Sequence, residues 1–255
     1  MKLCDIINNL DTLIPTTLSE EWDNDGVMLA LDREREIGRT VVTLDVTRDA
    51  IEFAKKNGAD LIISHHPFIF NPLKNLDTCL KTELILELIR SNISVLSYHT
   101  RFDNSEGGMN DSLAAALGYE NTVPLDGMAR AGDLPDTFSP EEFAVWVGEK
   151  LSCDVVLYSG RNTISRAAVL GGGGKDFVAP ARLAGIDAIV TGDIPHRIVT
   201  EEVEAGITVV DAGHFGTEKI FVDAILPFLE KAGISLDTVF QFRGEDPAVF
   251  VCKEK

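Results

Sequence analysis

Apolar and polar residues follow two alternating periods along this chain, which predict helices and strands in turn. The first helix is predicted over 3–13, where apolar residues recur at helical spacing and Pro15 ends the pattern. Short runs rich in β-branched residues predict strands over 40–46 and 61–64. Between them, a helical pattern over 51–58 ends in Asn-Gly, a common helix stop. This order is a β-α-β unit, which predicts parallel strands.

The same alternation continues up to a segment that we expect to link two halves of the chain. A helix over 80–89 and a strand over 93–98 follow, and a helix over 109–117 closes the first half. Residues 121–140 are rich in Pro, Gly and Asp, and we predict that they connect the halves. A capping box at Ser139 then starts the next helix, with proline at its first position.

The second half repeats the pattern of the first. Gly185 and Asp187 match Gly58 and Asp60 at a constant offset, each pair lying just before or within a predicted strand. Five elements are predicted after residue 165, in the order strand, helix, strand, helix, strand: 167–170, 177–183, 185–191, 198–204 and 207–211. Internal duplication explains this recurrence, and it predicts an α/β protein with pseudo-repeat halves at about 1–125 and 126–255.

All five histidines lie at or shortly after the carboxyl end of a predicted strand. This is the edge at which open α/β sheets bind ligands. An acidic residue, Asp103 or Glu218, follows two of these histidines at a distance of four positions. A single histidine is commonly a core or surface residue, so the shared placement is what indicates a metal site. The five are His65 and His66 after 61–64, His99 after 93–98, His196 after 185–191, and His214 after 207–211.

Imidazole and carboxylate ligands together suit Zn, Fe, Mn or Ni. Neighbouring side chains on an extended chain point to opposite sides, so His65 and His66 cannot easily chelate one ion. They could each hold one of two ions, or one ion and a substrate. With two acids available, we predict two divalent ions that share a carboxylate. Such pairs lie roughly 3.5–4 Å apart and activate a bridging water.

Two further stretches leave alternatives open. Residues 20–26 have the composition of a tight acidic turn, and the alternative is that Asp23 or Asn24 reaches into a site. The four glycines at 171–174 predict a turn between a strand and a helix. A phosphate-binding loop is the weaker alternative, because Asp176 stands after the lysine where that motif requires Ser or Thr.

Composition and charge narrow the class of protein. The chain has 255 residues, 45% hydrophobic and 25% charged, which is ordinary for a soluble globular protein. The N-terminus predicts an amphipathic helix instead of a signal peptide, and the four cysteines lie far apart, so we expect a reduced, cytoplasmic compartment. A formal charge of −18 argues against a nucleic-acid partner, and no apolar run is long enough for a membrane span.

These residues resemble the Nif-three-like family, whose members are known as dinuclear metal centre proteins or GTP cyclohydrolase I type 2 homologues. The resemblance runs over nearly the whole chain. It implies a duplicated three-layer α/β/α architecture with the metal site between two similar halves, without the inserted domain of longer members, and a ring-shaped homohexamer. The matching motifs are Trp22-Asp23-Asn24, His65-His66-Pro67, Ser97 to Asn104, Gly192-Asp193 with His196, and Asp211 to Glu218.

The resemblance also implies roles for individual residues. The implied metal ligands are His65, His66, Asp103, His214 and Glu218. In this assignment His66 and Asp103 hold one ion, His65 and His214 hold the other, and Glu218 bridges both. Tyr98, His99 and His196 border the site, and the two histidines take acid/base or substrate-orienting roles.

The implied function is that of a metal-dependent hydrolase acting on a small molecule such as a nucleotide. Its sharpest form is the hydrolytic opening of the guanine imidazole ring with release of formate. A metal-dependent phosphoesterase is the main alternative within the enzymes, because paired ions also stabilise phosphoryl transfer. The alternative outside the enzymes is a non-catalytic metal-binding or regulatory protein.

Overall fold

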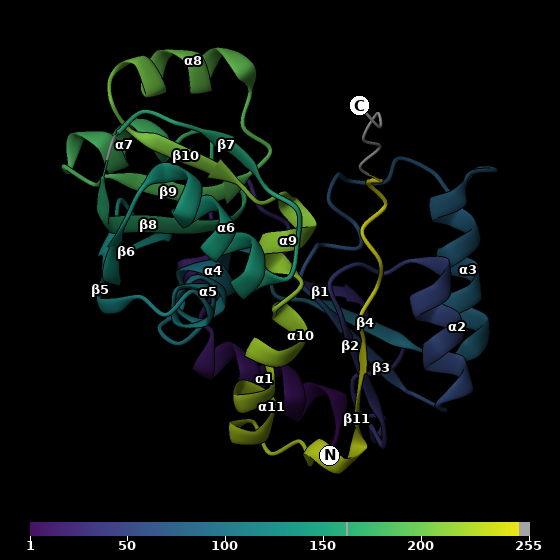
Figure 1. Ribbon diagram of the computed structural model, residues 1–255. Coiled ribbons are helices and arrows are strands. Elements are labelled where there is room, and N and C mark those ends of the chain that lie inside the picture. Colours follow the sequence, from purple (N-terminus) through teal and green to yellow (C-terminus); the bar gives the residue numbers. More distant parts are fainter. Residues whose placement is uncertain (162, 250–255) are drawn as a thin grey trace.

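The first of two β-sheets is built mainly from the N-terminal part of the chain (Figure 1). The computed structural model describes residues 1–161 and 163–249. The strand order is β1-β4-β3-β2-β11, in which β1 runs antiparallel to β4 and the other neighbours are parallel. The strands are β1 (Gly26–Leu29), β2 (Thr40–Thr43), β3 (Leu61–Ser64), β4 (Ser94–Ser97) and β11 (Val239–Phe242).

Helices cover both faces of this first sheet, because its central strands are apolar on both sides. Val41, Ile62 and Val95 face the layer of α2 (Arg48–Lys56) and α3 (Leu80–Ser91). The next residue along each strand packs in the opposite core, as the two-residue period of a strand requires. That core includes α1 (Leu3–Leu13), α10 (Phe221–Ala224) and α11 (Leu226–Lys231).

The second sheet has the order β5-β6-β8-β9-β10-β7 and is likewise covered on both faces. Its strands are β5 (Glu120–Leu125), β6 (Ala129–Phe138), β7 (Val156–Tyr158), β8 (Ile164–Gly173), β9 (Ala188–Gly192) and β10 (Thr208–Asp211). On one face lie α5 (Met109–Ala116) and α6 (Pro140–Leu151), and on the other α7 (Val178–Leu183) and α8 (His196–Glu204). The predicted three-layer α/β/α architecture is confirmed, with parallel central strands and antiparallel edges.

The two sheets share one topology over four strands. The order β7-β10-β9-β8 repeats β1-β4-β3-β2, including the antiparallel edge strand. Asp60 accepts hydrogen bonds from the backbone N–H groups of residues 38 and 39, just before β2. Asp187 accepts the equivalent bonds from residues 165 and 166 at the start of β8. These matching contacts support the proposed duplication.

The segment 121–140, which was predicted to connect the halves, forms most of the hairpin of β5 and β6 and so is part of the second sheet. Asp126 and Gly127 form its turn with φ of 44° and 88°, the left-handed conformation that tight hairpins require. Pro124 lies in β5, the edge strand, where a missing N–H donor is tolerated. The Asp-Gly pair is therefore a hairpin signal within a segment that otherwise has the composition of a linker.

The expected turn at 171–174 is also mostly strand, since β8 continues through Gly173. The N–H of Gly171 donates to Asn110 Oδ1 at 2.8 Å, and that of Gly172 donates to Thr217 Oγ1 at 2.9 Å. Two of the donors that a phosphate-binding loop would need are thus already used within the protein, which removes the basis for that alternative.

The C-terminal segment returns to the first sheet, where β11 pairs with β2. Asn9 of α1 donates to the carbonyl oxygen of Ala232 at 2.9 Å. The boundary between halves near residue 125 stays a prediction, since each sheet also takes elements from beyond its own repeat. Short 3₁₀ helices occur at Thr16–Leu18 and Leu236–Thr238.

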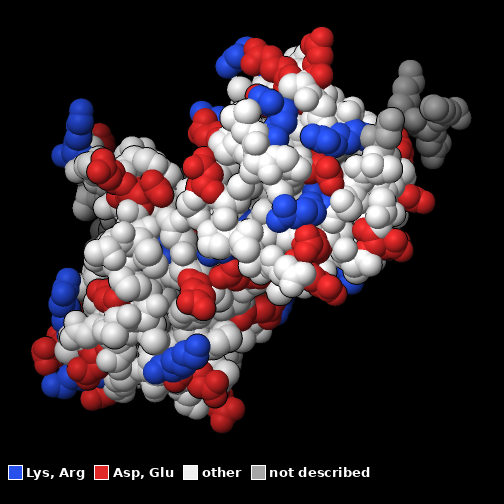
Figure 2. Space-filling view, turned by 90° about the vertical axis from the view of Figure 1, so that its left-hand side faces the viewer, with Lys and Arg blue, Asp and Glu red and all other residues white. Residues whose placement is uncertain are grey.

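Charged side chains lie scattered over the surface, with acidic and basic groups interspersed on the face drawn in Figure 2. None of the helices in the described ranges has the length and apolar character needed to cross a membrane. Cys4, Cys79 and Cys153 are free thiols, and Cys252 lies outside the described residues.

Candidate metal centre

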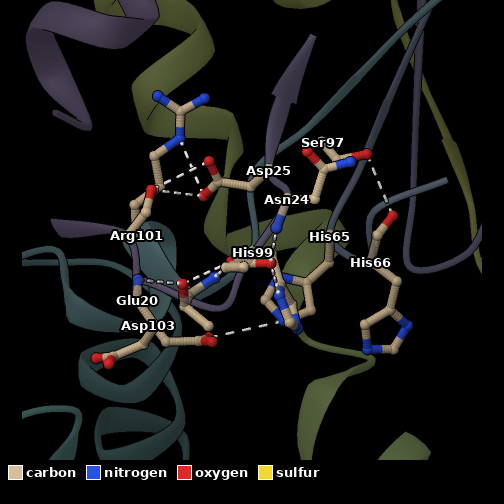
Figure 3. Close-up of polar contacts among 12 residues, drawn as sticks. Glu20, Asn24, Asp25, His65, His66, Ser97, His99, Arg101 and Asp103 are labelled. Atoms are coloured by element: carbon tan, nitrogen blue, oxygen red, sulfur yellow. Dashed lines mark hydrogen bonds and ion pairs between the residues drawn. The ribbon is translucent and has the colours of Figure 1, made fainter. Parts of the chain in front are cut away.

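Four of the five histidines come together where the two sheets meet. His65 and His66 follow β3, and His99 follows β4 at the start of α4 (Thr100–Asn104). His214 follows β10 and begins α9 (His214–Glu218). The ring centroid of His65 lies 5.1 Å from the centroids of both His66 and His99, and the ring centroids of His66 and His214 lie 5.2 Å apart. Figure 3 shows the rings from the first sheet side by side.

The carboxylate of Glu218 lies among three of these rings. Its Oε2 atom lies 2.9 Å from His66 Nε2 and 3.0 Å from His214 Nε2. Its Oε1 atom lies 3.7 Å from His65 Nε2. Glu218 is only 3% exposed. Its buried carboxylate faces the pair of His66 and His214 with one oxygen and His65 with the other.

Asp103 is the second buried acid of the cluster, and its Oδ1 atom lies 3.7 Å from His65 Nε2 (Figure 3). Within the described part of the chain, neither of these two buried atoms has a hydrogen-bond partner. A buried polar atom without a partner costs on the order of 1–3 kcal/mol. A cation between the two would satisfy both atoms, so the cluster fits a metal ion.

A hydrogen bond at the Nδ1 atom of each histidine fixes the orientation of its ring. This is the arrangement in which second-layer groups orient metal-binding imidazoles and leave Nε2 directed at the ion. The Nδ1 partners are Tyr98 O for His65 at 2.9 Å, Asp45 for His66 at 2.7 Å, Asp23 for His99 at 2.9 Å, and Asp193 for His214 at 2.8 Å.

The sequence assigns no role to Asp45, includes Asp193 only as part of a motif that matches the family, and favours a plain loop for Asp23. The structure supports the other alternative for Asp23, whose buried side chain also accepts from Thr100 Oγ1 at 2.6 Å. Asp45 lies two positions after β2, and Asp193 follows β9 directly. Both are at the same sheet edge as the histidines. Both acids therefore carry the same sequence signal as the histidines, a position at or shortly after the carboxyl end of a predicted strand.

Burial and mutual contacts shift the pKa values of the three clustered rings in different directions. Burial lowers the pKa of His65 to about 4. Burial opposes the charge on His66, but hydrogen bonds with Asp45 and Glu218 raise its pKa to about 10. The hydrogen bond with Glu218 raises the pKa of His214 to about 9. A metal ion that binds these rings would displace the protons of His66 and His214.

The two acids are shifted in opposite directions. Burial, reinforced by the nearby charge of Glu218, raises the pKa of Asp103 well above its usual range. Burial acts the same way on Glu218, but the surrounding histidines overcome it and hold its pKa well below the usual range. Glu218 is thus the permanent negative charge at the centre.

The distances group the donors differently from the assignment implied by family resemblance. His66 and His214 lie together, with their Nε2 atoms 3.2 Å apart, and both contact one oxygen of Glu218. His65 lies beside Asp103 and the other oxygen. A donor nitrogen of His99 also falls within 4.8 Å of those of His65 and His66.

Two residues expected to border the site, Tyr98 and His196, have side-chain contacts outside the cluster. The ring of Tyr98 is buried in the core, where the Arg101 guanidinium lies 4.3 Å from its centroid, so only its carbonyl serves the site. His196 is an exposed residue at the start of α8, and its ring lies 3.5 Å from Thr200 Oγ1, one turn along the same helix.

Gly172 makes room for the central carboxylate. A Cβ atom at this position would lie 2.3 Å from Glu218 Oε1 and 3.2 Å from His214 Cε1. Its φ of +65° also disfavours any other residue. One of the four glycines is therefore required by the packing of the centre itself.

Comparison with known proteins places the chain in a family. The model of the Duf34/NIF3 family (NGG1p interacting factor 3) matches residues 1–247. A protein of Clostridium perfringens named GTP cyclohydrolase 1 type 2 homolog is 32% identical over 266 residues, covering 98% of this chain and all of the relative. NIF3-like protein 1 of Drosophila melanogaster is 29% identical over 247 residues, covering 91% of this chain and 82% of the relative.

Solved structures agree with this placement. A Bacillus cereus protein related to NIF3 superposes with a TM-score of 0.90 at 22% identity, covering 98% of this chain and 99% of that protein, which shows the shared fold. Reduced HcgD from Methanocaldococcus jannaschii superposes with a TM-score of 0.83 at 29% identity, covering 94% and 97%. The resemblance found in the sequence is confirmed, and the chain belongs to the Duf34/NIF3 family.

Proposed function

We propose that this protein is a metal-dependent hydrolase that binds two divalent cations between its sheets and acts on a small molecule. The observation that carries the proposal is the buried carboxylate of Glu218, which presents one oxygen to His66 and His214 and the other to His65. Two donor sets that share one carboxylate form the arrangement in which paired ions occur.

In this proposal, His65 and Asp103 would hold one cation, His66 and His214 the other, and Glu218 would bridge them. Nitrogen and carboxylate donors without cysteine suit Zn, Fe, Mn or Ni. When bound, such a pair would lower the pKa of water and polarise the carbon or phosphorus centre under attack.

His99 is the chain's own candidate for moving a proton. Its Nδ1 is held by Asp23 at 2.9 Å, which leaves Nε2 as the atom that can take up or give a proton. Burial opposes the charge on Asp23, but hydrogen bonds from His99 and Thr100 lower its pKa to about 2. Asp23 thus stays ionised, and its hydrogen bond to His99 Nδ1 holds the orientation of that ring. His196, assigned the same role from the sequence, is exposed at the start of α8, where it could act on a bound substrate.

The names of relatives suggest the most specific substrate to test. Several are named GTP cyclohydrolase 1 type 2 homolog, and this chain covers nearly the whole length of those from two Clostridium species. We therefore propose GTP, or another nucleotide, as the first substrate to test, with hydrolytic opening of the guanine imidazole ring and release of formate. By family resemblance alone, we further propose a ring-shaped homohexamer. The widely spaced cysteines lead us to propose a cytoplasmic location, and the formal charge of −18 leads us to propose that nucleic acid is not a partner.

The test combines metal content with product formation. We expect about two ions per chain by elemental analysis, and formate release from GTP that stops when a chelator is added. Glu218→Gln should abolish both, whereas His196→Gln, an exposed residue outside the cluster, should retain its ions. Phosphate release from phosphoesters without formate would favour the phosphoesterase alternative. Two ions with no turnover on either substrate class would favour a non-catalytic metal-binding role, and no ions at all would reject the proposal.

A further inference from the structure

Two large aromatic side chains stand exposed beside the metal centre. Trp22 is 60% exposed and Phe70 is 45% exposed, although residues of this size are usually well covered. Their ring centroids lie 6.2 Å apart. We call this pair the aromatic ledge.

The ledge adjoins the centre through His99. Trp22 and Phe70 lie 6.1 Å and 6.5 Å from the His99 ring, both nearly perpendicular to it. His99 in turn lies 5.1 Å from His65 and 5.7 Å from His66. A ring-sized molecule that reaches the donors of the centre from this side therefore has to pass over exposed aromatic surface.

Polar contacts hold the backbone under the ledge while leaving its rings free. Asp23, next to Trp22, is buried and bonded to His99 and Thr100. Asn24 Nδ2 donates to the carbonyl oxygen of Ile69 at 2.5 Å, which ties the loop of Trp22 to that of Phe70. Each aromatic residue is thus the immediate neighbour of a fixed one. A surface arranged before its ligand arrives loses less conformational entropy on binding.

We propose that the aromatic ledge, formed by Trp22 and Phe70, recognises the substrate by stacking against a planar nitrogen heterocycle of the purine type. Exposed aromatic rings bind nucleobases by stacking, which is worth about 1–3 kcal/mol per base. The inference rests on the proposed function in placing the reacting group at the metal centre, but base binding itself needs no turnover.

Fluorescence offers a direct test, because the chain has only two tryptophans. The other, Trp146, lies half-buried on α6, where its Nε1 donates to the carbonyl oxygen of Leu117. In the full-length metal-loaded protein carrying Trp146→Phe, emission comes from Trp22. We expect guanosine 5′-monophosphate to quench this emission saturably, and ribose 5-phosphate, which lacks the base, to leave it unchanged.

Calorimetric titration of Trp22→Leu then measures the contribution of the ring. The stacking range corresponds to a roughly 5- to 150-fold weaker Kd for guanosine 5′-monophosphate. Trp22→Phe should recover most of the affinity, and Phe70→Leu should weaken binding in the same direction. Ion content should be unchanged in all three, since neither side chain is among the clustered donors.

The outcomes separate this inference from the proposed hydrolase. Unchanged affinity in Trp22→Leu, or equal quenching by ribose 5-phosphate, rejects base stacking on the aromatic ledge even if formate release persists. Base binding that depends on Trp22 without any turnover supports stacking on the aromatic ledge and rejects the proposed hydrolase function. If Trp22→Leu instead lowers the mass of the assembly in light scattering while base binding stays intact, the ledge is a contact with a second copy and the inference is wrong.

Discussion

The two sheets have the same core topology but contribute differently to the metal centre. Directly after β3 the first sheet carries His65. At the offset that matches Asp60 with Asp187, the equivalent residue of the second sheet is Gly192, the last residue of β9. A Cβ atom at Gly192 would lie 2.6 Å from the backbone of residues 213 and 214. The second sheet therefore cannot carry a side chain there, because its own His214 segment occupies the space.

The acids at matching positions also differ. Asp103 lies four residues after His99, and Glu218 lies four residues after His214. The longer side chain of Glu218 reaches three histidines, while Asp103 approaches only His65 among them. One repeat therefore supplies most of the nitrogen donors, and the other supplies the carboxylate shared between them.

The largest expected effect comes from exchanging each acid for its amide. Glu218→Gln should lose both ions, because its two oxygens face both donor sets. Asp103→Asn should lose one ion and keep the other at His66 and His214. We expect the affinity for the affected ions to fall at least about 100-fold, measured by elemental analysis after dialysis. Equal losses in the two variants would show that the acids are not specialised.

The next prediction tests the space kept open beside Glu218. Gly172→Ala places a Cβ atom 2.3 Å from Glu218 Oε1, and the positive φ adds about 1–2 kcal/mol of strain. We expect reduced ion content and a lower free energy of unfolding in urea. Gly173→Ala is the matched control, since the nearest atom to its new Cβ lies 4.0 Å away. A Gly172→Ala protein with full ion content would contradict this account.

A smaller effect should separate the carboxylates behind two of the rings. Asp45→Asn should weaken ion binding about 10- to 100-fold, because it removes the partner of His66 Nδ1. Asp193→Asn should weaken it less, since Asp193 and His214 are the more exposed pair. The ratio of the two dissociation constants, measured by competition with a chromogenic chelator, checks the order. The reverse order would place the stronger support in the second sheet.

The smallest effect concerns stability and pH. The pKa of Asp23 falls from 3.8 to about 2 on folding, so its ionised form stabilises the protein on the order of 2 kcal/mol above pH 4. This contribution declines as the pH falls from about 4 toward 2. The difference in unfolding free energy between the wild type and Asp23→Asn should therefore be largest near neutral pH and shrink at pH 3. A difference independent of pH would mean that the charge of Asp23 is not what stabilises it.

The sequence predicted most of the fold because the relevant signals are local. Periodicity located the strands ending before His65, His99 and His214, and the capping box at Ser139 forms as predicted. The 121–140 hairpin was missed because overall Pro, Gly and Asp content outweighed the specific Asp126-Gly127 signal. Strand β11 was not predicted at all.

The site was predictable as far as strand ends reveal it. The clustering of four histidines followed from the rule that carboxyl edges of parallel strands meet. The grouping of donors did not, because it depends on side-chain lengths and on how the two sheets face each other. His196 shows the limit of the rule, since a few residues beyond a strand were enough to carry it onto an exposed helix.

The return of β11 to the first sheet has a consequence for synthesis on the ribosome. The second sheet is built from one uninterrupted stretch, from β5 to β10, so it can be completed while the chain is still emerging. The first sheet, although it begins the chain, waits for residues 239–242 to fill its edge beside β2. We therefore expect the later-made sheet to mature first, and the N-terminal strands to remain unfinished until translation nears its end.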